Sequence, residues 1–244
     1  MAALAVGSVV AGYRVEGLLG QGGMGAVYRA RSEDSGAAVA LKVIAGGLAD
    51  DPMFRERFRR EAFAAAALDH RNVVPVLEAN EYQGALFLAM QLIDGVDLAT
   101  LLQERHVLDP HLAVSLVAQV ASGLDAAHAL GLVHRDIKPA NILIAYGDGE
   151  PHAYLTDFGV ARRLQQRTRL TGTGLVVGTV GYLAPEALRG DGAGPAADIY
   201  ALGCVLFETL TGGPPFAGDN DVAVILAHVE QQPPPLANPA AGIP

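Results

Sequence analysis

The residues most suited to chemistry form a polar octapeptide, HRDIKPAN over residues 134–141, between two apolar stretches. Polar groups at this density usually line a site. Asp136 can accept or orient a hydroxyl proton, Lys138 can neutralise a transferring phosphoryl group, and Asn141 can bind a metal. His134 is an alternative general base, but attack of a hydroxyl on phosphorus needs orientation more than a strong base. We therefore interpret His134 as a packed, hydrogen-bonding residue and Asp136 as the catalytic carboxylate.

A second acidic segment, DFG over residues 157–159, begins sixteen residues after Asn141. Its carboxylate is a hard oxygen ligand of the kind that Mg²⁺ prefers, and this cation keeps substrate phosphates in its coordination shell. The three residues alone would be weak support, but their order and spacing after the octapeptide make chance remote. Asn141 and Asp157 are therefore the predicted metal ligands.

A glycine-rich run, GQGGMG, consists of Gly20, Gln21, Gly22, Gly23, Met24 and Gly25. Glycines allow tight turns and bring backbone N–H groups close to an anionic phosphate. Taken alone, such a run often marks only a hairpin. It joins two predicted strands rather than a strand and a helix, which argues against a Rossmann dinucleotide site. Val27 follows where an apolar side chain could cover a flat base.

A lysine and a glutamate are expected to meet inside the first half of the chain. The alternation in VALK, residues 39–42, places Ala40 and Lys42 on one face of a strand, where a buried lysine is costly unless paired. In the next predicted helix, one face carries Phe54, Phe58, Glu61, Ala65 and Leu68. A lone carboxylate in this stripe would be expensive. Unless Lys42 lies at a strand edge in water, or the helix turns Glu61 toward water, we expect a Lys42–Glu61 ion pair.

The elements that must position these residues change in type near Gly95. Before it, β-formers predict strands over residues 13–20, 26–31, 37–44, 73–78 and 86–92, with one helix over 52–68 that Asp51 caps ahead of Pro52. After it, apolar spacing predicts a helix that begins at Asp109-Pro110, contains Ala113, Leu116, Val117, Val120, Leu124 and Ala127, and stops near Gly131. A hairpin over 142–145 and 153–156, a surface loop over 162–177 and an apolar helix over 196–210 follow. This order predicts an α+β architecture.

Composition limits the classes of function. The chain has 244 residues, 51% of them hydrophobic, and a formal net charge of −9, which argues against a nucleic-acid binder with a basic surface. Its single cysteine, Cys204, excludes an internal disulfide framework. The N-terminus does not read as a signal peptide, and no apolar run looks long enough to span a bilayer; the nearest, over residues 199–210, is interrupted by Glu208. We expect a soluble, cytoplasmic domain.

The ordered motifs resemble the eukaryotic-like protein kinases, and GQGGMGAVY over residues 20–28 together with HRDIKPAN is most similar to the bacterial serine/threonine branch. The resemblance covers the chain from about residue 10 to the tail. It implies a two-lobed protein-kinase fold, with a β-rich N-lobe over residues 1–94 that contains one key helix and a mainly helical C-lobe over 95–244. It also implies ATP with Mg²⁺, or alternatively Mn²⁺, and protein substrates.

The resemblance further implies a role for each matched residue. The run from Gly20 to Gly25 would cover the phosphates, and Lys42 would contact them while paired with Glu61. The remaining roles are adenine contacts from Val27, Ala40 and Leu143, a gatekeeper at Met90, adenine recognition by the backbone of Gln91 and Ile93, ribose contact at Asp97, catalysis by Asp136 with Lys138 and Thr179, and Mg²⁺ binding by Asn141 and Asp157.

Substrate class and regulation are also implied by the resemblance. Lys138, two residues after the catalytic aspartate, is typical of the Ser/Thr branch, and GTVGYLAPE over residues 178–186 resembles a platform for a substrate chain. Arg135 is typical of kinases that are activated by loop phosphorylation. We expect autophosphorylation at Thr171 and Thr173 in preference to Thr168, with self-association for reaction in trans. Before phosphorylation, the arginines of this loop belong to a solvated, flexible segment.

The chain departs from the family pattern at two places. Gln91 stands where an acid is usual, with little effect expected on ATP binding. The platform glutamate, Glu186, lacks its usual arginine near the C-terminus, because no Lys or Arg follows Arg189 and the chain ends at Pro244. We interpret the C-lobe as truncated, with its last helices missing and any membrane anchor beyond residue 244; alternatively, Arg189 or water satisfies Glu186. A pseudokinase-like binding or scaffold module and a small-molecule kinase are the other functions considered.

Overall fold

The computed structural model describes residues 4–23, 25–44, 49–147, 149–158, 180–189 and 192–236. The chain divides into two compact units. Unit 1 comprises Met1–His70 and Val74–Ile93, and unit 2 comprises Arg71–Val73 and Asp94–Pro244. The division into a nucleotide-binding lobe over residues 1–94 and a catalytic lobe over 95–244 stays a prediction.

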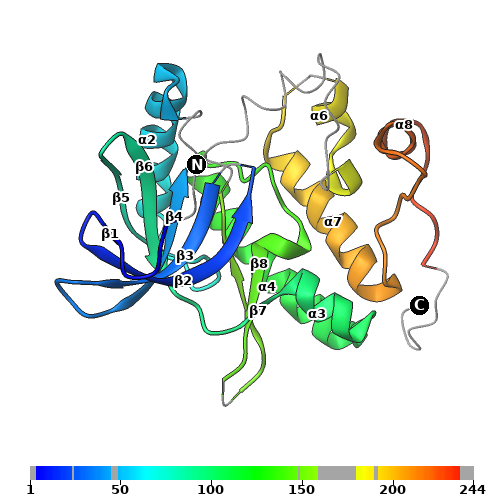
Figure 1. The fold of residues 1–244 in the computed structure, drawn as a ribbon. Coiled ribbons are helices and arrows are strands. Elements are labelled where there is room, and N and C mark those ends of the chain that lie inside the picture. The colour runs from blue at the N-terminus through cyan, green and yellow to red at the C-terminus, as the bar shows by residue number, and fades with distance from the viewer. Residues whose placement is uncertain are drawn as a thin grey trace. The chain divides into compact units, whose positions relative to one another are not determined.

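Unit 1 is built on a six-stranded antiparallel sheet with the order β1-β2-β3-β4-β6-β5 (Figure 1). One face of this sheet carries a core that includes Val15, Tyr28, Leu41 and Phe87, all at most 2% exposed. The strands are β1 (Val9–Val10), β2 (Tyr13–Gly22), β3 (Gly25–Ser32), β4 (Ala38–Ile44), β5 (Val76–Tyr82) and β6 (Ala85–Gln91).

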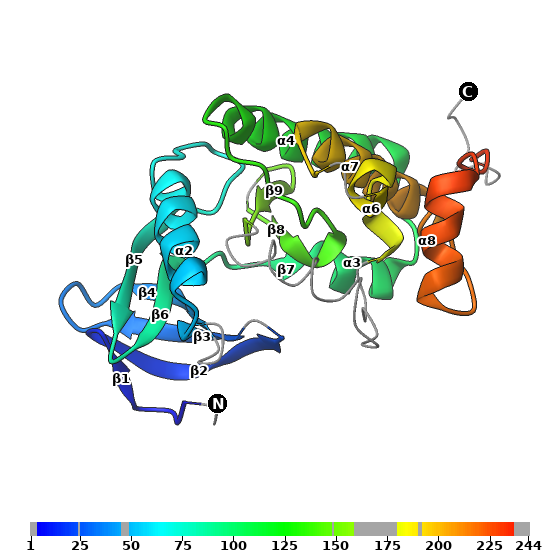
Figure 2. The same cartoon turned by 90° about the horizontal axis from the view of Figure 1, so that it is seen from above.

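Helix α2 (Pro52–Ala66) packs against β5 (Figure 2). Asp51 caps it as predicted, because its carboxylate accepts a hydrogen bond from the backbone N–H of Met53 at 2.9 Å. Proline at the first helical position loses nothing, since its missing N–H would have no partner there. The predicted inward face is confirmed, with all five of its members buried: Phe54, Phe58, Glu61, Ala65 and Leu68.

The strand expected over residues 73–78 begins later than predicted, at Val76. The reason is that residues 71–73 belong to unit 2, where Asn72 and Val73 pair with residues 153–155. The carbonyl of Asn72 accepts from the backbone N–H of Leu155 at 2.8 Å, and its side-chain amide donates to the carbonyl of Ala153 at 3.0 Å. Val73 forms a parallel bridge with Leu155. The apolar residues predict a strand here, but the sequence does not show which strand they pair with.

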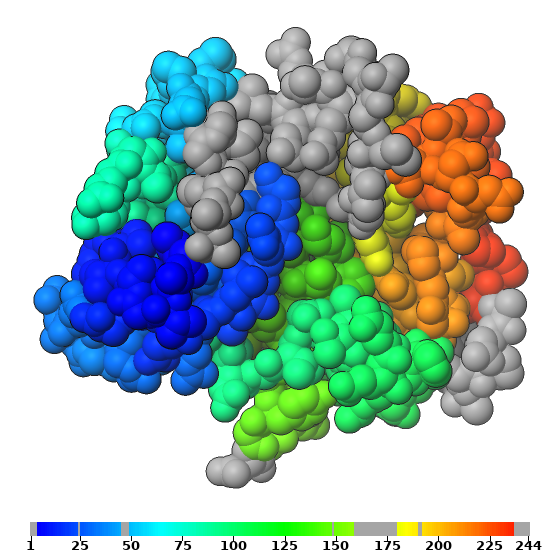
Figure 3. Space-filling view, viewed as in Figure 1, coloured from blue at the N-terminus to red at the C-terminus, as the bar shows by residue number. Residues whose placement is uncertain are grey.

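Unit 2 is mainly helical. It carries a small antiparallel sheet of β7 (Val96–Asp97), β8 (Ile142–Ala145) and β9 (His152–Leu155), so the predicted hairpin is present with its second strand one residue early. The turn between β8 and β9 projects from the surface beyond α3 (Figure 3). The helices are α3 (Leu98–Arg105), α4 (Pro110–Ala129), α6 (Pro185–Arg189), α7 (Pro195–Thr211) and α8 (Asp221–Glu230), with short 3₁₀ turns at Pro139–Asn141 and Val180–Tyr182.

Helix α4 packs against α7 and β9 and forms the centre of unit 2. Asp109 caps it, and Gly131, with φ +73°, follows its end as predicted. Its predicted inward residues are buried except Val117, which is half-buried. Helix α4 has 20 residues, and an 18-residue window of it has a mean hydropathy of 1.3, so it has the length and composition of a membrane span that the sequence was not expected to contain. A core helix meets the same criteria, and the contacts of α4 with α7 and β9 give it that role.

Candidate functional site

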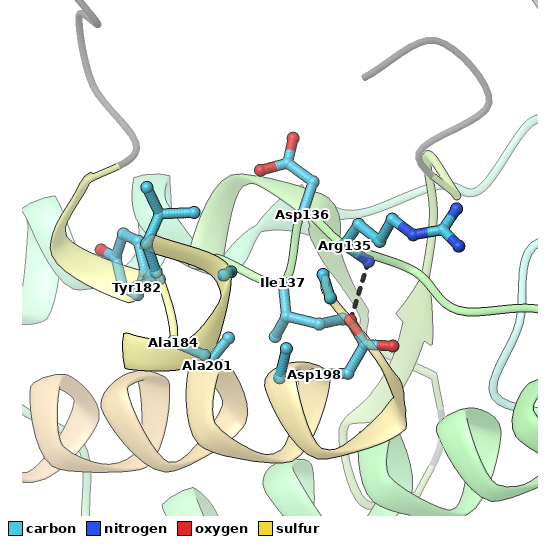
Figure 4. A pocket seen from close by; sticks show the side chains of 11 residues that line it. Arg135, Asp136, Ile137, Tyr182, Ala184, Asp198 and Ala201 are labelled. Atoms are coloured by element: carbon cyan, nitrogen blue, oxygen red, sulfur yellow. Dashed lines mark hydrogen bonds between the residues drawn. The ribbon is translucent and has the colours of Figure 1, made fainter. Parts of the chain in front are cut away.

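Residues 134–136 are attached to helix α7 through one buried carboxylate. Asp198, 1% exposed, accepts from the backbone N–H of His134 at 2.8 Å and of Arg135 at 2.7 Å. Its Oδ2 also lies 2.8 Å from Nε2 of His128 on α4. Figure 4 shows the Arg135 bond beside a small cavity of about 20 Å³. Two helices therefore fix the backbone that carries Asp136.

His134 is the packed histidine that the sequence predicted. It is fully buried, its Nε2 lies 2.9 Å from the carbonyl of Thr156, and its ring lies against Phe158 with centroids 4.7 Å apart. Its Nδ1 accepts from the backbone N–H of Asp136 at 3.2 Å. Burial lowers the pKa of this imidazole, and the two bonds match a neutral ring protonated on Nε2. Neither nitrogen is available to act as a base.

Asp136 and Lys138 lie side by side. The ammonium of Lys138 is 3.0 Å from Oδ2 of Asp136, and their side chains are 23% and 10% exposed. Figure 4 shows the Asp136 carboxylate pointing away from Asp198 and α7. Arg135, just before it, has φ +64°, a backbone conformation that is uncommon outside glycine. A carboxylate and an ammonium presented together can orient a hydroxyl group while attracting an anion.

Asn141 and Asp157 follow on adjacent segments. The side-chain amide of Asn141 donates to the carbonyl of Asp136 at 2.7 Å, which directs its Oδ1 elsewhere as an oxygen ligand. Its backbone carbonyl accepts from the N–H of Thr156 at 3.0 Å, beside Asp157, whose φ is +61°. No group of three or more His, Cys, Asp or Glu in the described part of the chain could hold a metal alone. One amide oxygen from Asn141 and one carboxylate from Asp157 form a donor set that fits Mg²⁺, which takes few protein oxygens and completes its shell with water and phosphates. Their role as metal ligands stays a prediction.

In unit 1, strand register brings the predicted base-covering residues onto one face of the sheet. Val27 pairs with Lys42, Ala40 with Met90, and Lys42 with Leu88. Directly opposed residues point to the same side, so these side chains share the face opposite the core of Val15 and Tyr28. Met90 is buried, whereas Val27, Ala40 and Lys42 are half-buried. The adenine and gatekeeper roles stay predictions, on a face that can carry them.

Glu61 and Ile93 also belong to unit 1. Glu61 is 9% exposed on α2, and Ile93 is half-buried at the end of the unit. Burial of a carboxylate requires a partner of opposite charge or several hydrogen bonds. The pairing of Glu61 with Lys42 stays a prediction that this burial favours.

The glycine-rich run forms the end of the β2–β3 hairpin. Gly22 pairs with Gly25, which has φ +145°, and a Cβ on Gly25 would lie 2.0 Å from the carbonyl oxygen of Val43. Only glycine fits there. At Gly20, Gly22 and Gly23 an added Cβ would meet no atom within 4 Å, so packing does not require glycine at these three positions. Met24 lies outside the described residues.

Two of the other predicted nucleotide contacts, Gln91 and Asp97, already have hydrogen-bond partners within the chain. The backbone N–H of Gln91 donates to the carbonyl of Pro75 at 3.0 Å, so adenine would have to use its carbonyl. Asp97 caps α3, since its two carboxylate oxygens accept from the N–H and the hydroxyl of Thr100, each at 2.9 Å. Leu143, paired with Asp97, is half-buried. A structural role for Asp97 was not predicted, and its ribose contact stays a prediction.

A pocket of about 600 Å³ lies beside Lys138 in unit 2. Its wall includes Tyr182, whose hydroxyl donates to Oε2 of Glu208 at 2.6 Å. Burial raises the pKa of Glu208, against the lowering effect of this bond. Burial, followed by the bond to Glu208, also raises the pKa of Tyr182. Tyr182 belongs to the predicted substrate platform, while Thr179, Thr168, Thr171 and Thr173 lie outside the described residues.

The prediction that Arg189 could replace the missing partner of Glu186 is wrong. Arg189 directs its guanidinium to the carbonyl of Val229 at 3.3 Å, and in the described part of the chain Glu186 has no ion pair. Residues three apart on a helix can meet, but here the guanidinium of Arg189 has the carbonyl of Val229 as its acceptor instead.

Sequence reasoning missed Asp198, His128 and Glu208. Each is a polar residue in a helix that was interpreted only from its apolar spacing. Asp198 had a usable signal, because it is one of two charged residues in the predominantly apolar helix α7. An acid in such a helix is rarely buried without a specific partner. The partner, the backbone 63 residues earlier, could not be identified from spacing.

Comparison with known proteins is consistent with this geometry. The family described as "Protein kinase domain" matches residues 13–237. Serine/threonine-protein kinase PknJ of Mycobacterium tuberculosis is 46% identical over 243 residues, 98% of this chain and 41% of PknJ. PknH of Mycobacterium bovis is 44% identical, over 98% of this chain and 39% of its own. The crystal structure of the Mycobacterium tuberculosis PknI kinase domain has a TM-score of 0.72 and 36% identity, covering 88% of this chain and 80% of that one. The chain thus spans about two fifths of the length of these curated relatives.

Proposed function

Because the chain belongs to the protein kinase domain family, in its serine/threonine branch, we propose that it transfers the γ-phosphate of ATP to Ser and Thr hydroxyl groups of proteins. Proteins of this family use ATP and a divalent cation. The observation that carries the proposal is the Asp136–Lys138 pair, held at 3.0 Å on a backbone that Asp198 fixes. The relatives named above are serine/threonine kinases, so a pseudokinase-like module is not favoured.

In the proposed reaction, Asp136 orients the substrate hydroxyl and accepts its proton. The bond from the hydroxyl oxygen to the γ-phosphorus forms while the bond from that phosphorus to the oxygen of the departing ADP breaks. Lys138 neutralises the charge on the transferring phosphoryl group. Since the His134 ring is fixed by two hydrogen bonds, Asp136 is the acceptor in this loop. Thr179 would contact both Asp136 and Lys138. Proton acceptance by a carboxylate is sufficient, because positioning dominates phosphoryl transfer.

The proposed nucleotide contacts are those that the resemblance assigns. The run Gly20–Gly25 would cover the phosphates, and Lys42 would contact them, oriented by Glu61. The adenine and ribose contacts remain those assigned by resemblance: Val27, Ala40, Met90, Gln91, Ile93, Asp97 and Leu143. Asn141 and Asp157 would bind Mg²⁺ or Mn²⁺, which when bound neutralises the phosphate oxygens.

Regulation and location are also proposed. Thr171 and Thr173 would be autophosphorylated in trans by a second copy, and the phosphate would order the loop through Arg135. We place the domain in the cytoplasm, with protein substrates rather than nucleic acids as partners. The relatives are longer than this chain, so the full-length protein would carry further segments.

Phosphate transfer by the wild-type chain and by Asp136→Asn tests the proposal. With labelled ATP, Mg²⁺ and a generic protein substrate, we expect label on Ser and Thr and a loss of about 10³-fold in Asp136→Asn. Asp136→Asn should still bind Mg²⁺-ATP, and its circular dichroism should match that of the wild type. Transfer at the wild-type rate by Asp136→Asn would contradict the mechanism. Nucleotide binding without any transfer by the wild type would favour the pseudokinase alternative.

A further inference from the structure

A three-way contact of Arg55 joins the first turn of helix α2 to the sheet of unit 1. Its Nη1 lies 2.5 Å from Oε2 of Glu81 on β5, its Nε donates to the carbonyl of Ala49, and its Nη2 donates to the carbonyl of Gly84 at 3.2 Å. One helical turn later, Nη2 of Arg59 lies 3.3 Å from the same oxygen of Glu81. One guanidinium therefore connects the segment before the helix, a strand and the turn after that strand.

The carboxylate of Glu81 is the centre of this contact, and it is only 31% exposed. The bond from Arg55, followed by the charges of Arg55 and Arg59, holds its pKa below the usual range against the effect of burial. The backbone N–H of Glu81 also donates a hydrogen bond to Oδ1 of Asn80 at 2.8 Å, which restrains the strand locally. Both the strand and the carboxylate are thus fixed where the helix meets them.

A second carboxylate in unit 1 has almost the same local chemistry but a different structural consequence. Glu16 lies 2.6 Å from Arg31 and 3.1 Å from Arg29. These residues lie on β2 and β3, which backbone hydrogen bonds already hold in register. A helix on a sheet has no such ladder, so side chains alone decide its rotation and its position along the strand. Loss of Glu81 should therefore move an element, whereas loss of Glu16 should not.

The geometry of α2 connects the Arg55–Glu81 contact to Glu61. Glu61 follows Arg55 by six residues, about 240° around the helix, so the two side chains point to different sides of one rigid rod. A rotation of about 20° would move a side-chain end that lies about 6 Å from the axis by about 2 Å. Such a displacement breaks an ion pair, and misplacement of about 1 Å can reduce a rate by 10²-fold.

We infer that Arg55 and Glu81 are positioning residues for phosphoryl transfer, because their contact fixes the rotation of α2 and thereby the placement of Glu61. The inference rests on the proposed function for its kinetic consequence, but not for its structural one. Neither residue is among the predicted contacts of the nucleotide or the substrate. Each acts through the helix that carries Glu61.

The test compares Glu81→Gln with the matched control Glu16→Gln, each of which removes one negative charge next to two arginines. We expect kcat of Glu81→Gln to fall about 10-fold and that of Glu16→Gln to stay within about 2-fold of wild type. Arg55→Lys, which keeps the charge but loses the planar fork, should behave like Glu81→Gln. Hydrogen exchange of the backbone amides in residues 52–66 should accelerate in Glu81→Gln and Arg55→Lys but not in the control.

A double-mutant cycle separates positioning from general destabilisation. In the Glu61→Gln background, Glu81→Gln should cause little further loss of kcat, because the group that it positions is already absent. An equal loss in both backgrounds would overturn the inference, as would an unchanged kcat or unchanged exchange in α2. If the wild-type chain transfers no phosphate, the proposed function fails. Even then, hydrogen exchange in residues 52–66 that is unchanged in Glu81→Gln would overturn the structural role of the Arg55–Glu81 contact.

Discussion

The segment around Asp136 in unit 2 and the glycine-rich hairpin in unit 1 are both assigned to phosphate chemistry, yet they are built in opposite ways. The first is held by buried groups: Asp198 accepts from two backbone N–H groups, and His134 is fully buried between Thr156 and Phe158. In the second, Gly20, Gly22 and Gly23 have open space where side chains would be.

The difference follows from what each region is proposed to do. Groups that orient a reacting hydroxyl must be held within a fraction of an ångström, and buried hydrogen bonds supply that precision. A loop that covers phosphates must admit and release a nucleotide, so it needs backbone N–H groups and few contacts of its own. Substitutions in the first region should therefore damage rate and stability together, and those in the second should separate the two.

The largest effect is expected from Asp198→Asn. Asparagine keeps the shape but replaces one acceptor oxygen by a donor, so the N–H groups of His134 and Arg135 and the ring of His128 cannot all be satisfied. We expect kcat to fall about 100-fold and the free energy of unfolding to fall by about 3 kcal/mol. Urea denaturation and phosphate transfer measure the two, with the exposed Asp125→Asn as control. A loss of rate with unchanged stability would contradict the comparison.

Two substitutions in the hairpin should have different outcomes. Gly25→Ala places a Cβ against the carbonyl of Val43 at a positive φ, and we expect a loss of about 2–4 kcal/mol of stability. Gly22→Ala meets no atom, so its stability should change by about 0.5 kcal/mol or less while KM for ATP rises. Thermal unfolding and ATP titration check both. Equal destabilisation by the two would show that the hairpin is not open at Gly22.

A smaller effect is expected at Asp97, where two substitutions distinguish its role as a helix cap from its predicted contact with ribose. Asp97→Ala should cost about 1 kcal/mol, because the N–H of Thr100 loses its acceptor. Asparagine also caps helices well, so Asp97→Asn should retain most of that stability. If Asp97 also contacts ribose, both variants raise KM for ATP. If KM changes only with Asp97→Ala, the residue acts as a cap alone.

The smallest effect concerns pH. Burial lowers the pKa of His134 in the folded chain below its value of about 6.5 in the unfolded chain. The unfolded state therefore binds more protons as the pH falls below about 6.5, and the stability present above that pH is progressively lost. Burial lowers the pKa of His228 in the same direction. The melting temperature should fall from about pH 7.5 to about pH 5.5, less steeply in His134→Gln; an equal slope would exclude His134 as a source.

Local signals explain what could be predicted from the sequence. Asp51 with Pro52 and Asp109 with Pro110 mark two helix starts, because capping depends on neighbouring residues alone. The alternation through Lys42 similarly predicted that Ala40 and Lys42 share one face of β4, opposite the buried Val39 and Leu41. Helix α8 also had a local cap in Asn220, whose Oδ1 accepts from the N–H of Ala223 at 2.9 Å, but no helix was predicted there.

Long-range pairing explains most of what the sequence could not provide. Asp198 contacts the backbone of His134 across 64 residues, and Arg55 contacts Glu81 across 26. Neither separation produces a periodic pattern. Arg189 illustrates the opposite error, since proximity to Glu186 in sequence suggested a pair that the structure replaces by a bond to Val229.

The contact of Asn72 with β9 has a consequence for synthesis of the chain. Asn72 leaves the ribosome 81 residues before Ala153, the acceptor of its side-chain amide. At about 5–20 residues per second, this interval lasts about 4–16 s. During that time the strands on either side of residues 71–73 can pair. Residues 71–73 themselves cannot form their contacts, because β9 has not yet been synthesised. A fragment of residues 94–244 would lack Asn72 and its bond to Ala153. We therefore expect more folded protein from the whole chain than from residues 1–93 and 94–244 expressed separately.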